Sequence, residues 1–217
     1  MITTIEQLLN IPIMESNEKM LVVQELVPSI RCEYYKLDMI PLLGDKFYLR
    51  ESVISKLKLA QEKLQQISPG AFFRIAYGYR HPYIQNAYFE TRKKEMSEKY
   101  PNITEIELIF KTHLLTAHPD VAGHSTGGAV DITIEDKNGV FDMGCKIADF
   151  SSNLIKTYAE GLTNEQIQNR ALLRDLLLRQ GFAPFEGEWW HFSYGDREWA
   201  AYYNKDNAIY DVFVINK

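Results

Sequence analysis

The segment Ala129-Val-Asp-Ile-Thr-Ile134 alternates apolar and polar residues, and it constrains the fold more than any other stretch of the chain. Side chains of a β-strand point alternately to opposite faces, so the aliphatic residues share one face while Asp131 and Thr133 share the other. The segment therefore predicts a strand that buries one face in a sheet. Gly127 and Gly128 precede it and allow the chain to turn sharply into the strand.

Four helices are predicted by apolar residues at helical spacing or by start and stop signals, over residues 53–67, 83–99, 105–115 and 163–180. Thr163 and Gln166 form a capping-box pattern for the last helix, and Gly181 is its C-terminal stop. Further strands are expected over residues 72–77, 189–194 and 209–215. Because helices and strands are interspersed without a regular βαβ rhythm, we expect an α+β fold with a central antiparallel or mixed sheet flanked by helices.

The chain length predicts a single domain. Its 217 residues compare with ~150 for a typical domain, and the sequence shows no linker-like stretch. Pro12, Pro28 and Pro41 interrupt short apolar runs in residues 1–50, which predicts irregular structure and short strands packed on the core.

Charge and hydropathy limit the partners that the chain is expected to bind. Its 24 Lys and Arg against 29 Asp and Glu give a net charge of −5, which argues against nucleic acid or an anionic membrane surface. No window approaches the length of a membrane-spanning helix, and the N-terminus reaches Glu6 without the pattern of a secretory signal. Cys32 and Cys145 are too few for a disulfide framework. We therefore expect a cytoplasmic protein, of an oligomeric state that these features do not specify.

Three residues could hold a metal ion: His124 in the loop before the alternating strand, Asp131 on the strand, and His191. Zinc binds imidazole nitrogen and carboxylate oxygen, and catalytic zinc sites use three protein ligands. Glu188 precedes His191 by three residues, where a carboxylate could act on water without ligating the metal. On a flat strand these two side chains point to opposite faces. Both can serve one metal only if Glu188 lies in the loop before the strand, where Gly187 permits a bend.

The same residues also allow a purely structural interpretation. His124 could be an ordinary loop histidine, and Asp131 a surface residue of a half-exposed strand. Trp189 and Trp190 could be core residues, with His191 a buried histidine whose hydrogen bonds are satisfied.

Other reactive side chains carry weaker signals. His113 and His118 have no partner at ligand spacing, so we expect solvated or locally bonded histidines. Cys145 lacks the sequence context of a catalytic nucleophile and is expected to be a small buried residue.

Several motifs together resemble a known family. They are Tyr77-Gly-Tyr-Arg80, His124-Ser-Thr-Gly-Gly-Ala-Val-Asp131, Asn169-Arg170, Gly181-Phe182 and Glu188-Trp-Trp-His191-Phe. On these residues the chain resembles the zinc-dependent D-alanyl-D-alanine dipeptidases of the VanX type. Their superfamily also contains D,D-carboxypeptidases and resembles the Hedgehog signalling domain. The resemblance covers roughly residues 70–200, which we expect to form the catalytic core.

The resemblance implies a zinc metallopeptidase. One zinc ion per chain would be held by His124, Asp131 and His191. Glu188 would be the general base and acid, and Arg80 would stabilise the transition state. The implied reaction is hydrolysis of D-Ala-D-Ala or a related dipeptide containing D-amino acids, with a small dipeptide as the binding partner. A D,D- or L,D-carboxypeptidase acting on peptidoglycan peptides is the first alternative, and a non-catalytic zinc-binding module is the second.

The positions that would recognise the substrate depart from the family pattern. The family commonly has Asp-Gly-Tyr-Arg-Pro, where this chain has Tyr77 and His81 at the two ends. A family aspartate that follows a Met-Gly pair binds the substrate's amino group. Asp149 is the nearest match and lies one residue further along. Ser125 and Tyr35 are further candidates for substrate contact, although packing accounts equally well for Tyr35.

Overall fold

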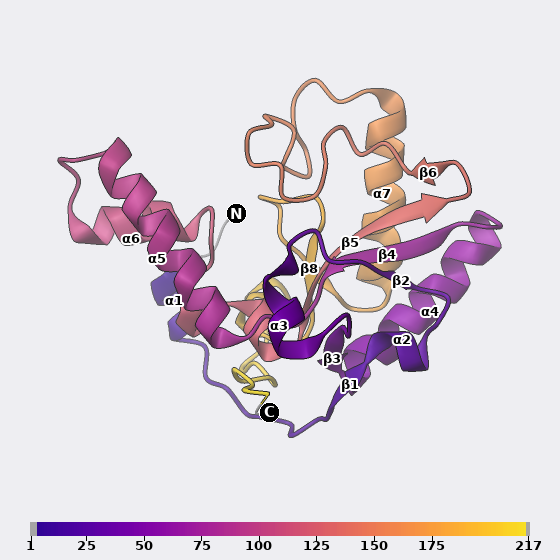
Figure 1. Cartoon of the computed structure of the whole chain (residues 1–217), viewed down its shortest axis with the longest axis horizontal. Helices are drawn as coiled ribbons and strands as arrows, with labels where there is room; N and C mark the ends of the chain where they lie inside the picture. The colour runs from indigo at the N-terminus through magenta and orange to yellow at the C-terminus, as the bar shows by residue number, and fades with distance from the viewer. Residues whose placement is uncertain (1–3, 216–217) are drawn as a thin grey trace.

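A six-stranded sheet forms the centre of the computed structural model, which describes residues 4–215 (Figure 1). Residues 1–3 lie outside the described residues. They begin the N-terminal segment in which the sequence shows no secretory-signal pattern. The strand order is β2-β4-β5-β8-β7, with β6 paired to β5. The strands are β2 (Arg31–Cys32), β4 (Phe72–Tyr77), β5 (Ala129–Asp136), β6 (Gly139–Val140), β7 (Ala183–Pro184) and β8 (His191–Ser193). β2 runs parallel to β4 and the other pairs are antiparallel, which confirms a mixed sheet.

The main core lies on one face of this sheet. In the antiparallel register of β4 and β5, Ile75 pairs with Ile132, so the apolar residues of both strands lie on the same face. Helices α4 (Glu51–Ile67) and α7 (Asn164–Arg179) pack on that face and contact each other beside the sheet (Figure 1). The predicted α+β class, with helices flanking the sheet, is confirmed.

The opposite face of β5 is closed as well. Asp131 is 3% exposed and Thr133 is fully buried. The interpretation of Asp131 as a surface residue is therefore wrong. The 3-10 turn η3 (Gly123–Thr126) packs against β5, and residues 129–135 are all buried.

The four predicted helices are present as α4, α7, α5 (Pro82–Lys99) and α6 (Glu105–His113). Thr163 and Gln166 form the predicted capping box of α7, and Gly181 follows its C-cap with φ of +83°. The helices α5 and α6 pack together as a hairpin that extends away from α4 and α7 (Figure 1). The 3-10 turn η2 (Pro119–Val121) connects this hairpin to the loop that carries His124.

Residues 4–50 form short elements, in agreement with the irregular structure predicted from the prolines. These are α1 (Ile5–Leu9), β1 (Met20–Val22), α2 (Val23–Leu26), β2, η1 (Leu37–Met39), α3 (Ile40–Leu43) and β3 (Tyr48–Arg50), with β1 and β3 paired antiparallel. Val23, Phe47 and Leu49 belong to the main core, so this part of the chain packs against α4 and the sheet.

The C-terminal strand predictions are wrong in part. β8 spans only His191–Ser193, and a short helix, α8 (Arg197–Tyr202), follows. Residues 209–215 form no strand. Their backbone groups bond to separate partners instead. The Asp211 N–H donates to the Glu15 carboxylate, and the Asp211 carbonyl oxygen accepts a hydrogen bond from Arg50. The Phe213 N–H donates to the Ser125 carbonyl oxygen. These bonds satisfy the backbone without a neighbouring strand.

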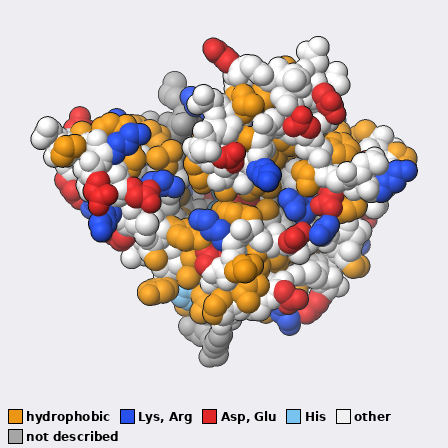
Figure 2. All heavy atoms as spheres, turned by 45° about the horizontal axis from the view of Figure 1, so that its top comes forward, with side chains coloured by type: hydrophobic (Ala, Val, Ile, Leu, Met, Phe, Trp, Pro, Cys, Tyr) orange, Lys and Arg blue, Asp and Glu red, His pale blue; other side chains and the backbone are white. Residues whose placement is uncertain are grey.

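The surface is mixed in charge. On the face drawn in Figure 2, acidic, basic and apolar side chains are interspersed. Within residues 4–215, no helix is both long enough and apolar enough to cross a membrane.

Candidate active site

The central sheet brings two of the predicted metal ligands together. Asp131 on β5 and His191 on β8 are antiparallel register partners, so their side chains share one face of the sheet. His124 reaches the same place from η3, which is followed by Gly127 with φ of +76°. A Cβ at Gly128 would lie 2.4 Å from the Tyr194 carbonyl oxygen, so the close approach of this loop to β8 requires glycine there.

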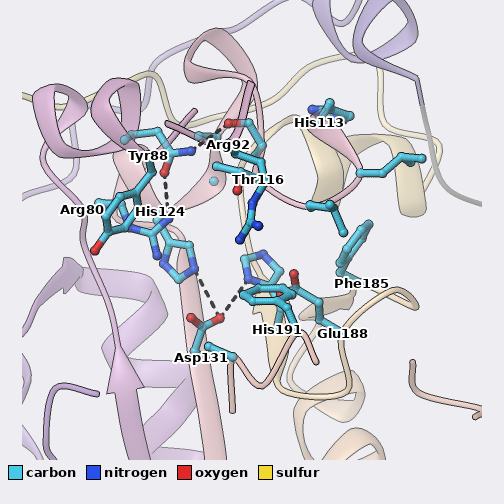
Figure 3. Close-up of a pocket in the computed structure, with 18 of the residues that line it drawn as sticks. Arg80, Tyr88, Arg92, His113, Thr116, His124, Asp131, Phe185, Glu188 and His191 are labelled. Atoms are coloured by element: carbon cyan, nitrogen blue, oxygen red, sulfur yellow. Dashed lines mark hydrogen bonds and ion pairs between the residues drawn. The ribbon is translucent and has the colours of Figure 1, made fainter. Parts of the chain in front are cut away.

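The three side chains form a compact cluster (Figure 3). Oδ1 of Asp131 lies 3.3 Å from Nε2 of His124 and 3.1 Å from Nδ1 of His191. Nδ1 of His124 lies 2.7 Å from the Gly78 carbonyl oxygen, so this nitrogen carries the proton and Nε2 offers a lone pair to the cluster. Within residues 4–215, this is the one group of three potential ligands close enough to share a metal ion.

The electrostatics of the cluster favour an ionised carboxylate. Burial alone would raise the pKa of Asp131, but His124 and His191 hold it well below its usual range. Burial opposes protonation of His191, yet the surrounding carboxylates, Asp131 first, raise its pKa to about 9. Burial lowers the pKa of His124. An anionic carboxylate between two imidazoles is an arrangement that attracts a divalent cation.

Glu188 lies beside this cluster but outside the strand. β8 begins only at His191, whose backbone N–H donates to the Glu188 carbonyl oxygen at 3.3 Å. Because Glu188 lies in this turn and not on the strand, its side chain and that of His191 need not point to opposite faces of the sheet. A Cβ at Gly187 would lie 2.6 Å from the Phe185 ring, so a larger residue in this turn would require that ring to move. Burial raises the pKa of Glu188 to about 7, which suits a group that accepts and returns a proton near neutral pH.

Arg80 lines the other side of the same cavity. Its Nη1 donates to Gln85 Oε1 at 2.8 Å, and its backbone N–H donates to the His124 carbonyl oxygen at 3.1 Å. The guanidinium lies over the rings of Tyr77 and Tyr88. Arg80 is therefore held in one orientation, and its buried Nε has no hydrogen-bond partner within residues 4–215.

A cavity of about 340 Å³ connects these groups and lies between α5, the end of α6 and the sheet. Tyr35 lines it, so contact with a substrate stays a prediction for this residue. Ser125 does not: it is fully buried, and the cavity wall there is formed by its neighbours Gly123 and His124.

Asp149 is also absent from the cavity wall. Its Oδ1 accepts hydrogen bonds from the backbone N–H and the hydroxyl of Ser151, at 3.3 and 2.6 Å. Ala148 and Phe150 line the cavity instead. The one-residue offset seen in the sequence thus turns the carboxylate of Asp149 away from the cavity and into a local turn.

Sequence reasoning missed Glu198 and the basic residues Lys36 and Arg92, which all line the cavity. Oε2 of Glu198 lies 3.7 Å from Nε2 of His191. The Gly195-Asp196 pair could have indicated a turn that brings the chain, and with it Glu198, back to His191. Nothing in the sequence indicates that Lys36 lies near α5.

Two further reactive residues make local hydrogen bonds, and one of them, His113, also lines the cavity. His113 is buried, and its Nδ1 accepts the backbone N–H of His118 at 3.1 Å, so the prediction of a locally bonded histidine is confirmed. Cys145 is half-buried and accepts a hydrogen bond from the Trp189 indole at 3.4 Å.

A histidine–aspartate–histidine cluster beside a half-buried glutamate, at the wall of a cavity, is the arrangement of a metal-dependent hydrolase. The chain belongs to the peptidase family M15, described as D-ala-D-ala dipeptidase, whose family model matches residues 48–212. It is therefore a metallopeptidase, and the family resemblance inferred from the sequence motifs is confirmed.

Curated relatives carry the name of the same family. The chain is 28% identical to a D-alanyl-D-alanine dipeptidase of Synechocystis sp., over 94% of this chain and 92% of the relative. It is 32% identical to a D-alanyl-D-alanine dipeptidase of Enterococcus faecalis, over 48% of this chain and 51% of the relative.

Two solved structures are also similar. One is a vancomycin-resistance D,D-pentapeptidase in complex with Zn(II), at 18% identity and a TM-score of 0.44, covering 76% of this chain and 84% of that chain. The other is the LD-carboxypeptidase LdcB, at 18% identity and a TM-score of 0.48, covering 87% of this chain and 72% of that chain.

Proposed function

We propose that this protein is a zinc dipeptidase that hydrolyses D-Ala-D-Ala or a related dipeptide containing D-amino acids. The observation that carries the proposal is the position of Asp131 Oδ1 between nitrogens of His124 and His191, with Glu188 and Arg80 on the wall of the same cavity. Membership of the D-ala-D-ala dipeptidase family supports this substrate class.

The donor set fits one zinc ion per chain. Ligands bound at 2.0–2.1 Å in tetrahedral geometry are about 3.3 Å apart. The two nitrogen–oxygen distances of 3.3 and 3.1 Å match that spacing. His124, Asp131 and His191 would therefore hold the ion and leave a fourth position open to the cavity.

The other residues have distinct roles in peptide hydrolysis. When bound, zinc would supply Lewis acidity, which activates water and polarises a carbonyl. Glu188 would take a proton from the attacking water and return it to the leaving amine, a transfer that its pKa of about 7 favours. Arg80 would direct its N–H donors at the negative charge that develops on the carbonyl oxygen. The hydrogen bond from Arg80 to Gln85 fixes this direction before the substrate binds.

A carboxypeptidase that trims peptidoglycan peptides is the second candidate, and one observation favours it. A dipeptidase binds a free substrate amine, but Asp149 is turned away from the cavity and Ala148 lines it instead. A non-catalytic zinc-binding module is disfavoured because a structural metal requires neither Glu188 nor Arg80 on the cavity wall.

A substrate panel tests the proposal. The purified zinc form would be assayed on D,D-, L,D-, D,L- and L,L-dipeptides of alanine, and on a tripeptide that ends in D-Ala-D-Ala, with Glu188→Gln as the inactive control. We expect the D,D-dipeptide to be cleaved fastest. Faster cleavage of the tripeptide would support the carboxypeptidase. No hydrolysis of any peptide would reject both.

A further inference from the structure

The two histidines of the cluster differ in the group that faces the ring nitrogen pointing away from Asp131. His124 Nδ1 is 2.7 Å from the carbonyl oxygen of Gly78, an acceptor that cannot change its charge. His191 faces Asp131 with Nδ1 and presents Nε2 to the carboxylate of Glu198, 3.7 Å away. Any metal held by His191 Nδ1 therefore has Glu198 on the far side of the same ring.

The local fold holds Glu198 in this position. The chain leaves β8 after Ser193, two residues beyond His191, and soon enters α8, whose N-cap is Asp196. Oδ1 of Asp196 accepts hydrogen bonds from the Trp199 backbone N–H and from the Ser193 hydroxyl, both at 2.8 Å. The cap therefore ties the first turn of α8 to β8. Because Glu198 lies in that first turn, its carboxylate is carried to the edge of the His191 ring.

The Glu198 carboxylate is not engaged elsewhere. Within residues 4–215 it accepts no hydrogen bond, and His191 is its ion-pair partner. The neighbouring Arg197 directs its guanidinium to the carbonyl oxygens of Ile11 and Asp120, at 3.1 and 2.8 Å. Glu198 therefore has acceptor capacity available for the imidazole.

We propose that Glu198 is a positioning residue for His191: its carboxylate accepts the Nε2–H of the imidazole and so holds Nδ1 toward the metal. A histidine that binds a metal through one nitrogen donates the N–H of the other to a carboxylate or carbonyl, which fixes the tautomer and increases the basicity of the ligand. Shortening the 3.7 Å separation to hydrogen-bond length requires a shift of about 0.8 Å. This inference rests on the metal site proposed above.

Zinc affinity measured without substrate tests the inference. Metal-free wild type, Glu198→Ala and Glu198→Gln would be titrated with zinc in competition with a chromophoric chelator. We expect Glu198→Ala to lower the apparent affinity by roughly 10- to 100-fold. Glu198→Gln should keep most of the wild-type zinc affinity, because the amide oxygen accepts the same hydrogen bond.

Glu95→Ala is the matched control. Glu95 lines the same cavity, but its carboxylate pairs with Arg92 at 2.7 Å and approaches no ligand, so zinc affinity should equal that of the wild type. Thermal unfolding of the metal-free forms would identify a variant that fails to fold, and the near-isosteric Gln variant guards against that outcome.

Three results would overturn the inference. They are wild-type zinc affinity in Glu198→Ala, an equal loss in the Gln and Ala variants, and a defect confined to KM for substrates with a free amine. The last result would assign Glu198 to the substrate. A wild type that binds zinc but cleaves no dipeptide would reject the proposed function alone.

Discussion

Asp131 and His191 are separated by 60 residues in the chain, yet they face each other directly across the β5–β8 ladder, with Oδ1 and Nδ1 3.1 Å apart. The sheet register therefore sets the separation of two of the three potential metal ligands. Backbone hydrogen bonds rather than flexible loops hold this pair, and such a scaffold positions ligands with little freedom.

Replacement of His191 by alanine should abolish stoichiometric zinc binding. Two ligands remain, and the anionic Asp131 loses the partner at 3.1 Å. Metal analysis of purified protein after dialysis would show about one zinc per chain in the wild type and little in the variant. His118→Ala, which removes a histidine outside the cluster, should retain zinc. Full zinc retention in His191→Ala would contradict the ligand assignment.

Glu188→Gln should separate catalysis from metal binding. Glutamine keeps the size and hydrogen-bonding capacity of the side chain but cannot take a proton at neutral pH. We expect unchanged zinc content and a fall in kcat of ~10²-fold or more. Steady-state kinetics together with metal analysis would check this result, and normal turnover would show that another group is the base.

Arg80→Lys should show whether the fixed guanidinium matters beyond its charge. Lysine keeps the positive charge but loses the planar set of donors that Gln85 orients at 2.8 Å. We expect kcat to fall by about 10²-fold with zinc content unchanged, the usual effect of removing a donor to a developing oxyanion. An unimpaired Arg80→Lys enzyme would mean that charge alone is sufficient.

The orientation of Asp149 leads to a prediction about amine recognition. If the enzyme is a dipeptidase, N-acetylation of a D,D-dipeptide should reduce kcat/KM by roughly 10- to 100-fold, because charged hydrogen bonds are lost. Asp149→Ala should leave that ratio unchanged, since its carboxylate bonds to Ser151 outside the cavity. Loss of the discrimination in Asp149→Ala would show that the carboxylate turns toward the substrate. Equal rates on the free dipeptide, its N-acetyl form and a tripeptide would favour the carboxypeptidase.

His113 should make the protein less stable in weak acid. Burial lowers its pKa from 6.5 to about 4, and its Nδ1 accepts the His118 N–H in the neutral form. The unfolded chain therefore binds a proton near pH 6.5 that the folded chain resists until about pH 4. Stability is fully present above this window and decreases as the pH falls through it.

Urea unfolding at several pH values between 4 and 7 would measure this effect. His113→Asn removes the titrating ring and keeps an acceptor. Its free energy of unfolding should therefore depend less steeply on pH in that window. An identical slope in wild type and variant would contradict the prediction.

Much of the architecture was predictable from local signals. The alternation in residues 129–134 identified β5, and the Thr163 capping box with Gly181 bounded α7. These predictions succeeded because each signal acts within a few residues of backbone. The strand predicted over residues 209–215 failed because its backbone is bonded to Glu15, Arg50 and Ser125, which are distant in sequence.

The sequence by itself determined the chemistry available to this protein: two histidines, an aspartate, a glutamate and an arginine within motifs that the family model matches. Only the tertiary structure decided which groups share the cavity. It placed Glu198 behind His191 and turned Asp149 away, although sequence reasoning had selected Asp149 and not Glu198. The physical reason is that side-chain direction depends on local backbone turns and on strand register. A shift of one residue reverses the direction in which a strand side chain points. The spacing of Asp149 shows such a shift, but only the folded turn shows that its carboxylate bonds to Ser151 and not to a group in the cavity.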